Sequence, residues 1–273
     1  MTSLSSRKAL VLLRDLIAER TGNYYGDHRL PILGDKIAGR AAELGFLTLL
    51  DYYYLLRYDP LQVEEWPVLE SLITVKETYF WREAEAFRAV VESILPHIKS
   101  PVRIWHAGCA QGEEPLSLLM ALDEAGLKPR DFDILATDLD RRALEKARLG
   151  RYTERAVQRL PPDKLERYFR LLPDGEYQVD SALLARVRFR PLNLVDEDHL
   201  RELAPFDIIF CRNVMIYFSE ALVTQVARHL YRLLKVPGFL FVGTTESLLS
   251  CRVPFVFSDL SGAIAYCKEV SGE

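Results

Sequence analysis

Apolar residues in the first part of the chain recur at the spacing of a helix. Leu10, Leu13 and Ile17 follow one another at three- and four-residue intervals, which places them on one face of an amphipathic helix. This pattern predicts a helix over residues 4–19. Thr21-Gly22 comes directly after it, and a glycine at that point is a common signal for the end of a helix.

Two further segments, 33–44 and 47–58, show the same amphipathic pattern, and a glycine separates them. Pro60 and Pro67 are expected to break the helices that follow, because proline lacks the amide hydrogen that an internal helical position needs. The sequence therefore predicts a small all-helical domain over residues 1–72.

From residue 102 onward, apolar runs of strand length alternate with amphipathic helical segments. Alternation of this kind implies parallel strands joined by helices, as in Rossmann-like folds. We therefore predict an α/β domain over residues 84–273, joined to the helical domain by a linker over residues 73–83. The expected strands are 102–107, 132–137, 187–190, 206–211, 239–243 and 263–268, and the expected helices are 115–125, 141–149 and 220–234, the last ended by Pro237-Gly238.

A different pattern interrupts this alternation between residues 170 and 190. Pro173-Asp174-Gly175 is a turn signal, and two short segments, 169–172 and 177–179, flank it. The sequence predicts a small β-hairpin subdomain inserted into the α/β domain at residues 170–190.

The junction between the first predicted strand and the next helix has the residue types of a nucleoside-binding site. Its turn is built from small residues, Gly108, Ala110 and Gly112, and Asp138 ends the following strand. A small-residue turn beside a carboxylate at a neighbouring strand end forms the nucleoside-binding half of a Rossmann-like fold. The carboxylate would accept hydrogen bonds from the ribose hydroxyls, and the predicted ligand is adenosyl.

Two acids, Glu113 and Glu114, stand at the start of the helix that follows this turn. Their negative charge would repel the phosphates of NAD or ATP at close range. The ammonium and sulfonium groups of S-adenosylmethionine would be attracted, and Glu114 is expected to face the ammonium. At this point an alternative stays open, in which the acids only stabilise the helix N-terminus through its dipole.

Polar residues follow two more of the predicted strands. Asn193 follows one of them, and its amide can both donate to and accept from adenine. Arg212 and Asn213 follow another, where a charged residue and an amide indicate a site. The carboxyl ends of parallel strands open onto one crevice, so we expect these residues to lie close to Gly108 and Asp138.

Composition narrows the possible functions only slightly. With 39 acidic against 35 basic residues the chain is mildly acidic, which argues against sequence-independent binding of nucleic acid. The four cysteines and five histidines are scattered, without the spacing of a metal site. Charged residues interrupt the apolar residues of the N-terminus, so we expect no signal peptide, no membrane insertion and a cytoplasmic location.

Five sequence blocks, taken in order, carry a resemblance to one family. They are residues 78–83 (TYFWRE), 107–115 (AGCAQGEEP), 136–140 (ATDLD), 192–194 (LNL) and 206–218 (FDIIFCRNVMIYF). On these blocks the chain resembles the CheR family of chemoreceptor glutamate O-methyltransferases. The resemblance is close after Thr74 and weak before it.

The resemblance implies a class I S-adenosylmethionine-dependent methyltransferase domain. Its substrate would be glutamate side chains in the cytoplasmic helical region of a chemoreceptor, and its products a glutamate methyl ester and S-adenosylhomocysteine. It also implies that Arg82 lies at the methyl-transfer site and that Tyr217 approaches the transferred methyl group. The residues predicted to bind the cofactor are Thr78, Arg82, Gly108, Ala110, Glu114, Asp138, Leu139, Asn193, Leu194, Arg212 and Asn213.

Other features of the family concern its partners. In the family the helical domain helps to engage the receptor, and in some members an antiparallel subdomain at the place of the hairpin binds a receptor peptide. Here the helical domain carries only a modest basic set, which could equally be a solvated face. The set consists of His28, Arg29, Lys36 and Arg40.

Two departures from the family pattern leave alternatives open. Lys76 stands where the family usually has asparagine, and Thr244-Thr245-Glu246 stands where it often has a histidine before Ser-Glu. One alternative is a methyltransferase that acts on another protein or on a small molecule. A second alternative is a catalytically silent signalling module that binds S-adenosylmethionine and receptors.

Overall fold

The structure is a computed structural model that describes residues 4–128, 131–260 and 262–269. The chain separates into two compact units. The first comprises Met1–Val75 together with Tyr217–Leu222, and the second comprises Lys76–Ile216 together with Val223–Glu273. Within the described ranges, no helix combines the length and the apolar composition that crossing a membrane requires.

Over the described residues 4–75, the first unit is built from four helices around one core, as the N-terminal pattern predicts. The apolar stripe of the first helix is buried, and Leu13 and Ile17 have no exposed surface. The same core takes in Ile37, Tyr52 and Trp66 from the other three helices. The helices are α1 (Leu4–Thr21), α2 (Leu30–Glu43), α3 (Leu49–Tyr58) and α4 (Gln62–Ile73).

Pro67 does not break a helix, contrary to our expectation. It lies inside α4, where it leaves the carbonyl of Val63 without its helical hydrogen bond. Val63 is 74% exposed, so water can hydrate that carbonyl. The buried Trp66, Leu69 and Ile73 hold the helix on the core on both sides of the proline, and tertiary burial therefore outweighs the local cost.

Two members of the predicted basic set take part in the packing of this unit. Arg40 forms an ion pair with the nearly buried Glu65 at 2.7 Å, and Tyr52 donates to the same carboxylate at 2.6 Å. Lys36 donates to the carbonyl of Leu72 at 2.8 Å. These cations therefore stabilise the helical unit itself.

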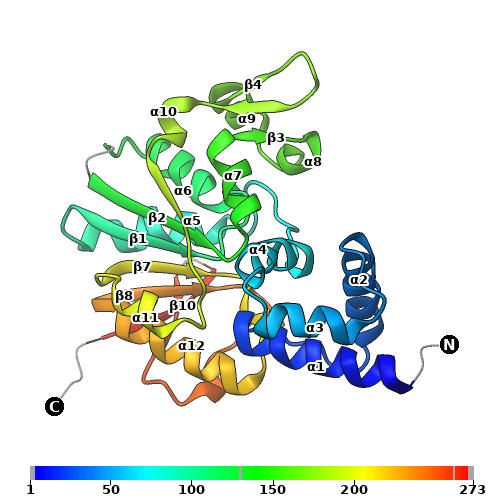
Figure 1. The fold of residues 1–273 in the computed structure, drawn as a ribbon. Helices are drawn as coiled ribbons and strands as arrows, with labels where there is room; N and C mark the ends of the chain where they lie inside the picture. The colour runs from blue at the N-terminus through cyan, green and yellow to red at the C-terminus, as the bar shows by residue number, and fades with distance from the viewer. Residues whose placement is uncertain (1–3, 129–130, 261, 270–273) are drawn as a thin grey trace. The chain divides into compact units, whose positions relative to one another are not determined.

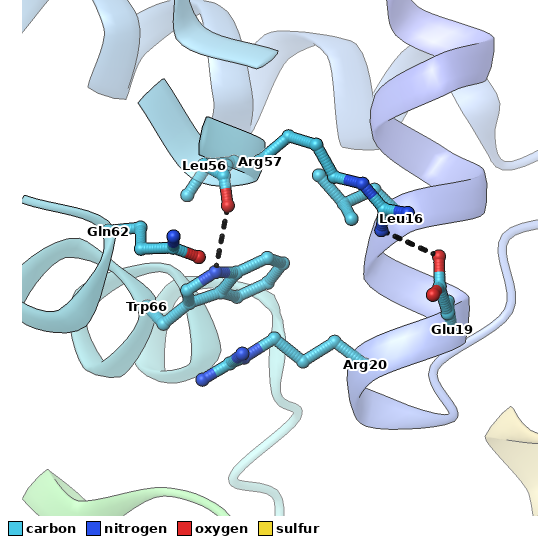
Figure 2. Close-up of a pocket in the computed structure, with 7 residues that line it drawn as sticks. All are labelled: Leu16, Glu19, Arg20, Leu56, Arg57, Gln62 and Trp66. Atoms are coloured by element: carbon cyan, nitrogen blue, oxygen red, sulfur yellow. Dashed lines mark hydrogen bonds and ion pairs between the residues drawn. The ribbon is translucent and has the colours of Figure 1, made fainter. Parts of the chain in front are cut away.

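The helical unit also has an open pocket of about 270 Å³ beside Trp66 (Figure 2). The indole Nε1 donates to the carbonyl of Leu56 at 3.2 Å, and the guanidinium of Arg20 lies 4.6 Å from the ring centroid. At the rim, Arg57 forms an ion pair with Glu19 at 3.0 Å. The charges around this pocket are thus balanced within the unit.

Residues 217–222 belong to the helical unit although they lie far away in sequence. The amide of Tyr24 donates to the carbonyl of Tyr217 at 2.8 Å. The guanidinium of Arg29 lies 5.8 Å from the centroid of the Tyr217 ring and 5.3 Å from that of Tyr25. Tyr217 therefore contacts Tyr24 and Arg29 of the helical unit.

The second unit contains the predicted α/β sheet (Figure 1). Its seven strands run in the order β6-β2-β1-β7-β8-β10-β9, and the pairs β6-β2, β2-β1, β1-β7 and β7-β8 are parallel. The last two strands pair antiparallel. The strands are β1 (Val102–Ala107), β2 (Phe132–Asp138), β6 (Val187–Pro191), β7 (Phe206–Cys211), β8 (Leu234–Val242), β9 (Val256–Leu260) and β10 (Ala263–Lys268).

The helices of this unit bury their apolar sides in the core around the sheet. Helix α6 places Leu116, Leu118 and Leu119 there with no exposed surface. The helical elements are α5 (Glu85–Ala89), η1 (Val90–Ile94), η2 (Leu95–His97), α6 (Glu113–Glu124), α7 (Arg141–Leu149), α8 (Glu154–Val157), α9 (Pro162–Tyr168), α10 (Ser181–Leu184), α11 (Glu197–Arg201), η4 (Met215–Tyr217), α12 (Glu220–Leu233) and η5 (Leu249–Cys251). The end of η4 and the start of α12 fall in the segment 217–222 of the first unit.

Strand β8 begins earlier than the sequence pattern predicts. Helix α12 ends at Leu233, and β8 starts at Leu234 rather than at Phe239, with Pro237-Gly238 inside it. The residues of β8 that pair with β7 are Leu234 and then Phe239 onward, so the pairing has an irregularity between them. Pro237 lies in this irregularity, where its missing amide hydrogen removes no hydrogen bond between the two strands.

The predicted hairpin is present as part of a three-stranded antiparallel sheet, drawn in green in Figure 1. Its strands β4 (Phe169–Leu171) and β5 (Tyr177–Val179) flank the expected turn. A third strand, β3 (Arg151–Tyr152), pairs with β5 from outside the predicted range.

Candidate functional site

The turn after β1 has a backbone that its small residues make possible. Gly108, Ala110 and Gly112 all have positive φ angles, of 87°, 47° and 91°. A Cβ atom at Gly108 would overlap the side chain of Val214. Only glycine therefore fits where the β1 turn meets the segment that follows β7.

Asp138, at the end of β2, holds this turn in place. Its Oδ2 accepts from the amide of Ala110 at 2.7 Å and its Oδ1 from the amide of Asp140 at 2.8 Å. Burial raises the pKa of Asp138 to about 6, against the opposing effect of the two amides and of Lys76. The carboxylate is half-buried, and its remaining lone pairs can accept further hydrogen bonds.

Lys76, where the family pattern has asparagine, forms an ion pair with Asp140 at 2.9 Å. Asp140 is only 1% exposed, and it also caps α7 by accepting from the amides of Arg142 and Ala143. Lys76 therefore neutralises a buried carboxylate next to Asp138.

Glu113 is a buried acid at the start of α6. It is 2% exposed, and burial raises its pKa to about 8. Its Oε2 has no hydrogen-bond partner within the described part of the chain. A positively charged ligand group next to this oxygen would satisfy it and favour the ionised carboxylate.

Glu114 belongs to a partly buried network of polar and charged side chains. It accepts from His106 Nδ1 at 2.7 Å and from Arg212 Nη1 at 3.1 Å. Arg212 in turn donates to Glu83 at 2.8 Å and to the carbonyl of Arg82 at 3.0 Å. Burial raises the pKa of Glu114, but the hydrogen bond from His106 and the charge of Arg212 outweigh burial and hold that pKa below its usual value.

The backbone on both sides of Arg82 adopts a conformation that has an intrinsic free-energy cost. Trp81 and Glu83, on either side of it, have positive φ angles of 67° and 51°, a conformation that non-glycine residues rarely adopt and that clusters at functional sites. The Trp81 amide donates to Ser117 Oγ at 3.0 Å, and Arg212 binds the Arg82 carbonyl. The Arg82 side chain keeps 30% of its surface exposed, so its guanidinium is accessible from a fixed backbone.

Glu246 anchors the segment that contains Asn213. One of its oxygens accepts from the amides of Asn213 and Gly243 at 2.6 and 2.7 Å. The other accepts from Val214 and Met215 at 3.1 and 2.8 Å. A single carboxylate thus joins the loop after β7 to the loop after β8.

The remaining predicted cofactor contacts follow the same strand ends. Asn193 Oδ1 accepts from the amide of Val195 at 3.1 Å, and the Leu192 amide donates to the carbonyl of Asp138 at 3.0 Å, which joins the end of β6 to the end of β2. Leu194 is buried, whereas Leu139 and Thr78 are half-buried.

All predicted cofactor-binding residues thus lie in the second unit, on its TYFWRE segment or at the carboxyl ends of β1, β2, β6 and β7. Tyr217 lies in the segment that belongs to the helical unit. Across the described residues, no group of three or more histidine, cysteine, aspartate or glutamate side chains could hold a metal ion.

Sequence reasoning missed the structural roles of Glu83, His106 and Glu246. Glu83 and Glu246 lie within segments that the family pattern singled out, but their partners are far away in sequence. Arg212 could be predicted because it is a charged residue directly after a strand. No local signal linked His106, a strand residue with 0% exposure, to Glu114.

Comparison with known proteins identifies the family of the α/β domain. The family pattern of the CheR methyltransferase, SAM binding domain, matches residues 76–263, which include the turn after β1, Asp138 and the loop after β7. S-adenosylmethionine is therefore the cofactor of this domain.

Similarity to individual proteins extends beyond the domain. The chain is 33% identical over 95% of its length to chemotaxis protein methyltransferase 2 of Vibrio cholerae and covers 92% of that protein. It is 34% identical over 86% of its length to the chemotaxis protein methyltransferase of Escherichia coli, of which it covers 82%. Chemotaxis protein methyltransferase 1 of Pseudomonas aeruginosa is 37% identical over 71% of the chain and 74% of that protein. The chain belongs to the CheR family of S-adenosylmethionine-dependent methyltransferases.

Proposed function

We propose that the chain transfers the methyl group of S-adenosylmethionine to glutamate side chains in the cytoplasmic helical region of chemoreceptors. The products are glutamate methyl esters and S-adenosylhomocysteine. The names of the relatives support chemotaxis as the process. The observation that carries the proposal is Arg82, an accessible guanidinium on a strained backbone beside the cofactor turn. Because the receptor region is cytoplasmic, the proposal also implies a cytoplasmic enzyme.

The residues at the strand ends hold the cofactor in this proposal. Asp138 accepts from the ribose hydroxyls, Asn193 binds adenine, and Glu113 and Glu114 provide negative charge for the methionine ammonium. S-adenosylmethionine supplies a methyl group bound to a positively charged sulfur. Burial raises the pKa of Glu113 to about 8, and the positive charge of the ammonium would lower that pKa and favour the ionised carboxylate.

The acceptor needs positioning rather than activation. A glutamate side chain in water has a pKa of about 4.3 and is ionised at neutral pH, so no general base is required. Arg82 presents a planar fork of donors that orients a carboxylate for in-line attack. Tyr217 presents an aromatic face that attracts the sulfonium cation. Positioning of this kind contributes up to roughly 7–11 kcal/mol to catalysis.

Binding of S-adenosylmethionine is expected to depend on the ionisation of Asp138. Its raised pKa of about 6 means that the group is protonated below pH 6, and a protonated carboxyl loses acceptor capacity for the ribose hydroxyls. Through Asp138 the affinity should fall about tenfold for each pH unit below 6, and protonation of Glu113, whose pKa burial raises to about 8, should lower it further between pH 8 and 6. Calorimetric titration between pH 5 and 8 measures this dependence.

The variant Asp138→Asn provides the matched control for that titration. It should bind about 100-fold more weakly at pH 8, the equivalent of roughly 2.7 kcal/mol, and show a flatter pH profile. Equal affinity of the two proteins at pH 8 would exclude Asp138 from the cofactor site.

The proposed reaction is tested with S-adenosylmethionine labelled in its methyl group and a panel of chemoreceptor cytoplasmic fragments. Glutamate methyl esters release labelled methanol when they are treated with base, so base-labile label in a fragment supports the proposal. Base-stable label, or label in a small molecule only, favours the first alternative, another methyl acceptor. Binding of fragments and cofactor with no transfer favours the second, a silent signalling module.

A further inference from the structure

The second unit has a cavity of about 490 Å³ that contains none of the residues assigned to the methyl-transfer site. Arg228 and Arg232, one turn apart on α12, contribute to one wall. Arg252, directly after η5, contributes to another. The cavity is thus lined by three exposed arginines that come from two separate parts of the chain.

These arginines have no carboxylate partner within 4 Å among the described residues. Arg228 and Arg232 are like charges at i and i+4, an arrangement that destabilises a helix. Elsewhere in the unit a carboxylate separates neighbouring arginines, as Asp133 does between Arg103 and Arg188. In the pocket beside Trp66, Arg57 is paired with Glu19 (Figure 2) and Arg20 is paired with Glu70.

The backbone at Arg252 adds an independent observation. Arg252 has a φ angle of 50°, in the left-handed region that non-glycine residues rarely adopt. Maintaining it costs on the order of 1 kcal/mol. The fold therefore tolerates strain at the residue that brings a third positive charge to the cavity.

The acidic residue of the cavity is already bound. Glu197 accepts from His229 Nε2 at 2.9 Å and forms an ion pair with Arg201 at 3.0 Å. His229 is 4% exposed, and its Nδ1 has no hydrogen-bond partner in the described ranges. Glu197 is thus engaged by His229 and Arg201 and also attracts Arg232 electrostatically, but one carboxylate leaves most of the positive charge of the three arginines available to a ligand.

We propose that this cavity binds an organic phosphate. Guanidinium groups only donate hydrogen bonds, and their forked geometry matches phosphate oxygens. A phosphate monoester carries about −1.5 to −2 charge at neutral pH, which balances most of the excess charge, whereas one carboxylate would balance only a third of it. The volume is within the range of small-molecule sites, and Val253 and Pro254 offer apolar contact to the organic part.

The proposal is tested by calorimetric titration of the full chain saturated with S-adenosylhomocysteine, which keeps the cofactor site filled. The probes are pyrophosphate, ribose 5-phosphate and, as the matched neutral ligand, ribose. We expect dissociation constants on the order of 0.1 mM for the two phosphates and no binding of ribose. The double variant Arg228→Gln/Arg232→Gln should bind both phosphates at least tenfold more weakly.

The variant Arg88→Gln/Arg170→Gln is the matched control. It removes two exposed arginines that also lack a carboxylate partner in the described chain but lie outside the cavity. It should bind the phosphates as the wild type does. Absence of phosphate binding to the wild type, or equal weakening in both double variants, would overturn the proposal, since the latter indicates a general effect of net charge.

A further titration, with a phosphoserine peptide, distinguishes a phosphorylated protein from a small metabolite as the source of the phosphate. A phosphoserine peptide that binds more tightly than ribose 5-phosphate, with the same loss in the Arg228→Gln/Arg232→Gln variant, identifies a phosphorylated protein. Tighter binding of ribose 5-phosphate identifies a small metabolite. Either result supports phosphate recognition. Unfolding midpoints of the variants within about 2 °C of the wild type exclude misfolding as the cause of weaker phosphate binding.

Discussion

Replacing Arg82 with alanine is expected to lower kcat for methyl transfer about a thousandfold while the affinity for S-adenosylmethionine changes less than twofold. The loss corresponds to roughly 4 kcal/mol of transition-state stabilisation, the magnitude typical of removing one preorganised charged donor. The measurement is the rate of base-labile labelling of a receptor fragment at saturating cofactor. Calorimetric titration of the cofactor gives its affinity.

The physical reason lies in how Arg82 is fixed. Its carbonyl is held by Arg212, and both neighbouring residues have positive φ, so the guanidinium extends from a backbone with little freedom. An alanine removes the guanidinium, with its hydrogen bond to the Glu77 carbonyl and its ion pair with Glu83, and leaves the contacts of Arg212 with the Arg82 carbonyl and Glu83 in place. Arg82 is also among the residues predicted to bind the cofactor, but its cationic guanidinium repels the cationic sulfonium, so the two effects on cofactor affinity should largely offset each other.

Arg159→Ala is the appropriate control for this variant. The Arg159 guanidinium lies 4.6 Å from the Tyr79 ring centroid, and that of Arg82 lies 5.6 Å from the same ring. Both changes therefore remove a cation from one aromatic side chain, but only Arg82 has the strained flanking backbone. A similar fall in kcat for both variants, or a parallel loss of cofactor affinity in Arg82→Ala, would show that Arg82 does not orient the acceptor.

The elements that the sequence predicts with correct bounds are those whose limits are set locally. Strand β7 is buried along its whole length, which a continuous apolar run predicts. Helix α7 begins after the Asp140 cap and ends at Gly150 in the left-handed conformation, and both signals stand in the sequence next to the helix.

Where prediction failed, distant contacts decided the structure. Pro67 stays helical because Trp66 and Ile73 are buried against other helices. The early start of β8 depends on its pairing with β7, where the register skips from Leu234 to Phe239. Neither effect can be read from the residues that flank these positions.

In the candidate site, too, some residues are placed by the local sequence and others by contacts with distant parts of the chain. Gly108 and Asp138 could be predicted because a turn and a strand end fix them within a few residues of their own position. Glu114 was expected to face a cation of the ligand, and in the structure it accepts from His106 and Arg212. Arg212 lies almost a hundred residues further along the chain, so its approach to Glu114 follows from sheet topology and not from spacing. The ammonium contact of Glu114 stays a prediction.

Replacing Glu246 with alanine is expected to lower the free energy of unfolding by roughly 3–5 kcal/mol and to weaken cofactor binding at least tenfold. The carboxylate accepts from four backbone amides at 2.6–3.1 Å, and each buried amide left without a partner costs about 1–3 kcal/mol. Partial rehydration of the loop keeps the total below the sum of four such losses. Urea denaturation and calorimetric titration measure the two effects.

Cofactor binding should suffer because Glu246 fixes the segment that contains Asn213. The φ angle of Asn213 is 58°, a conformation with an intrinsic cost, and Glu246 stabilises it by binding the Asn213 amide. Gly243 approaches so closely that a Cβ there would lie 2.6 Å from Asn213 Nδ2. Without the carboxylate, the segment relaxes and the Asn213 amide leaves its position at the end of β7.

Two variants separate this explanation from a general effect of charge. Glu202→Ala removes a surface carboxylate whose ion pair with Arg190 spans 3.4 Å and is largely exposed; such pairs contribute about 0–1 kcal/mol. It should leave both measurements nearly unchanged. Glu246→Gln keeps one acceptor oxygen and replaces the other with a donor that faces amide hydrogens, so it should be nearly as destabilised as the alanine variant. If Glu246→Gln unfolds at the wild-type urea concentration, the four amides are not what this carboxylate stabilises, and the loop after β7 must be held by its packing against Gly108 and Gly243.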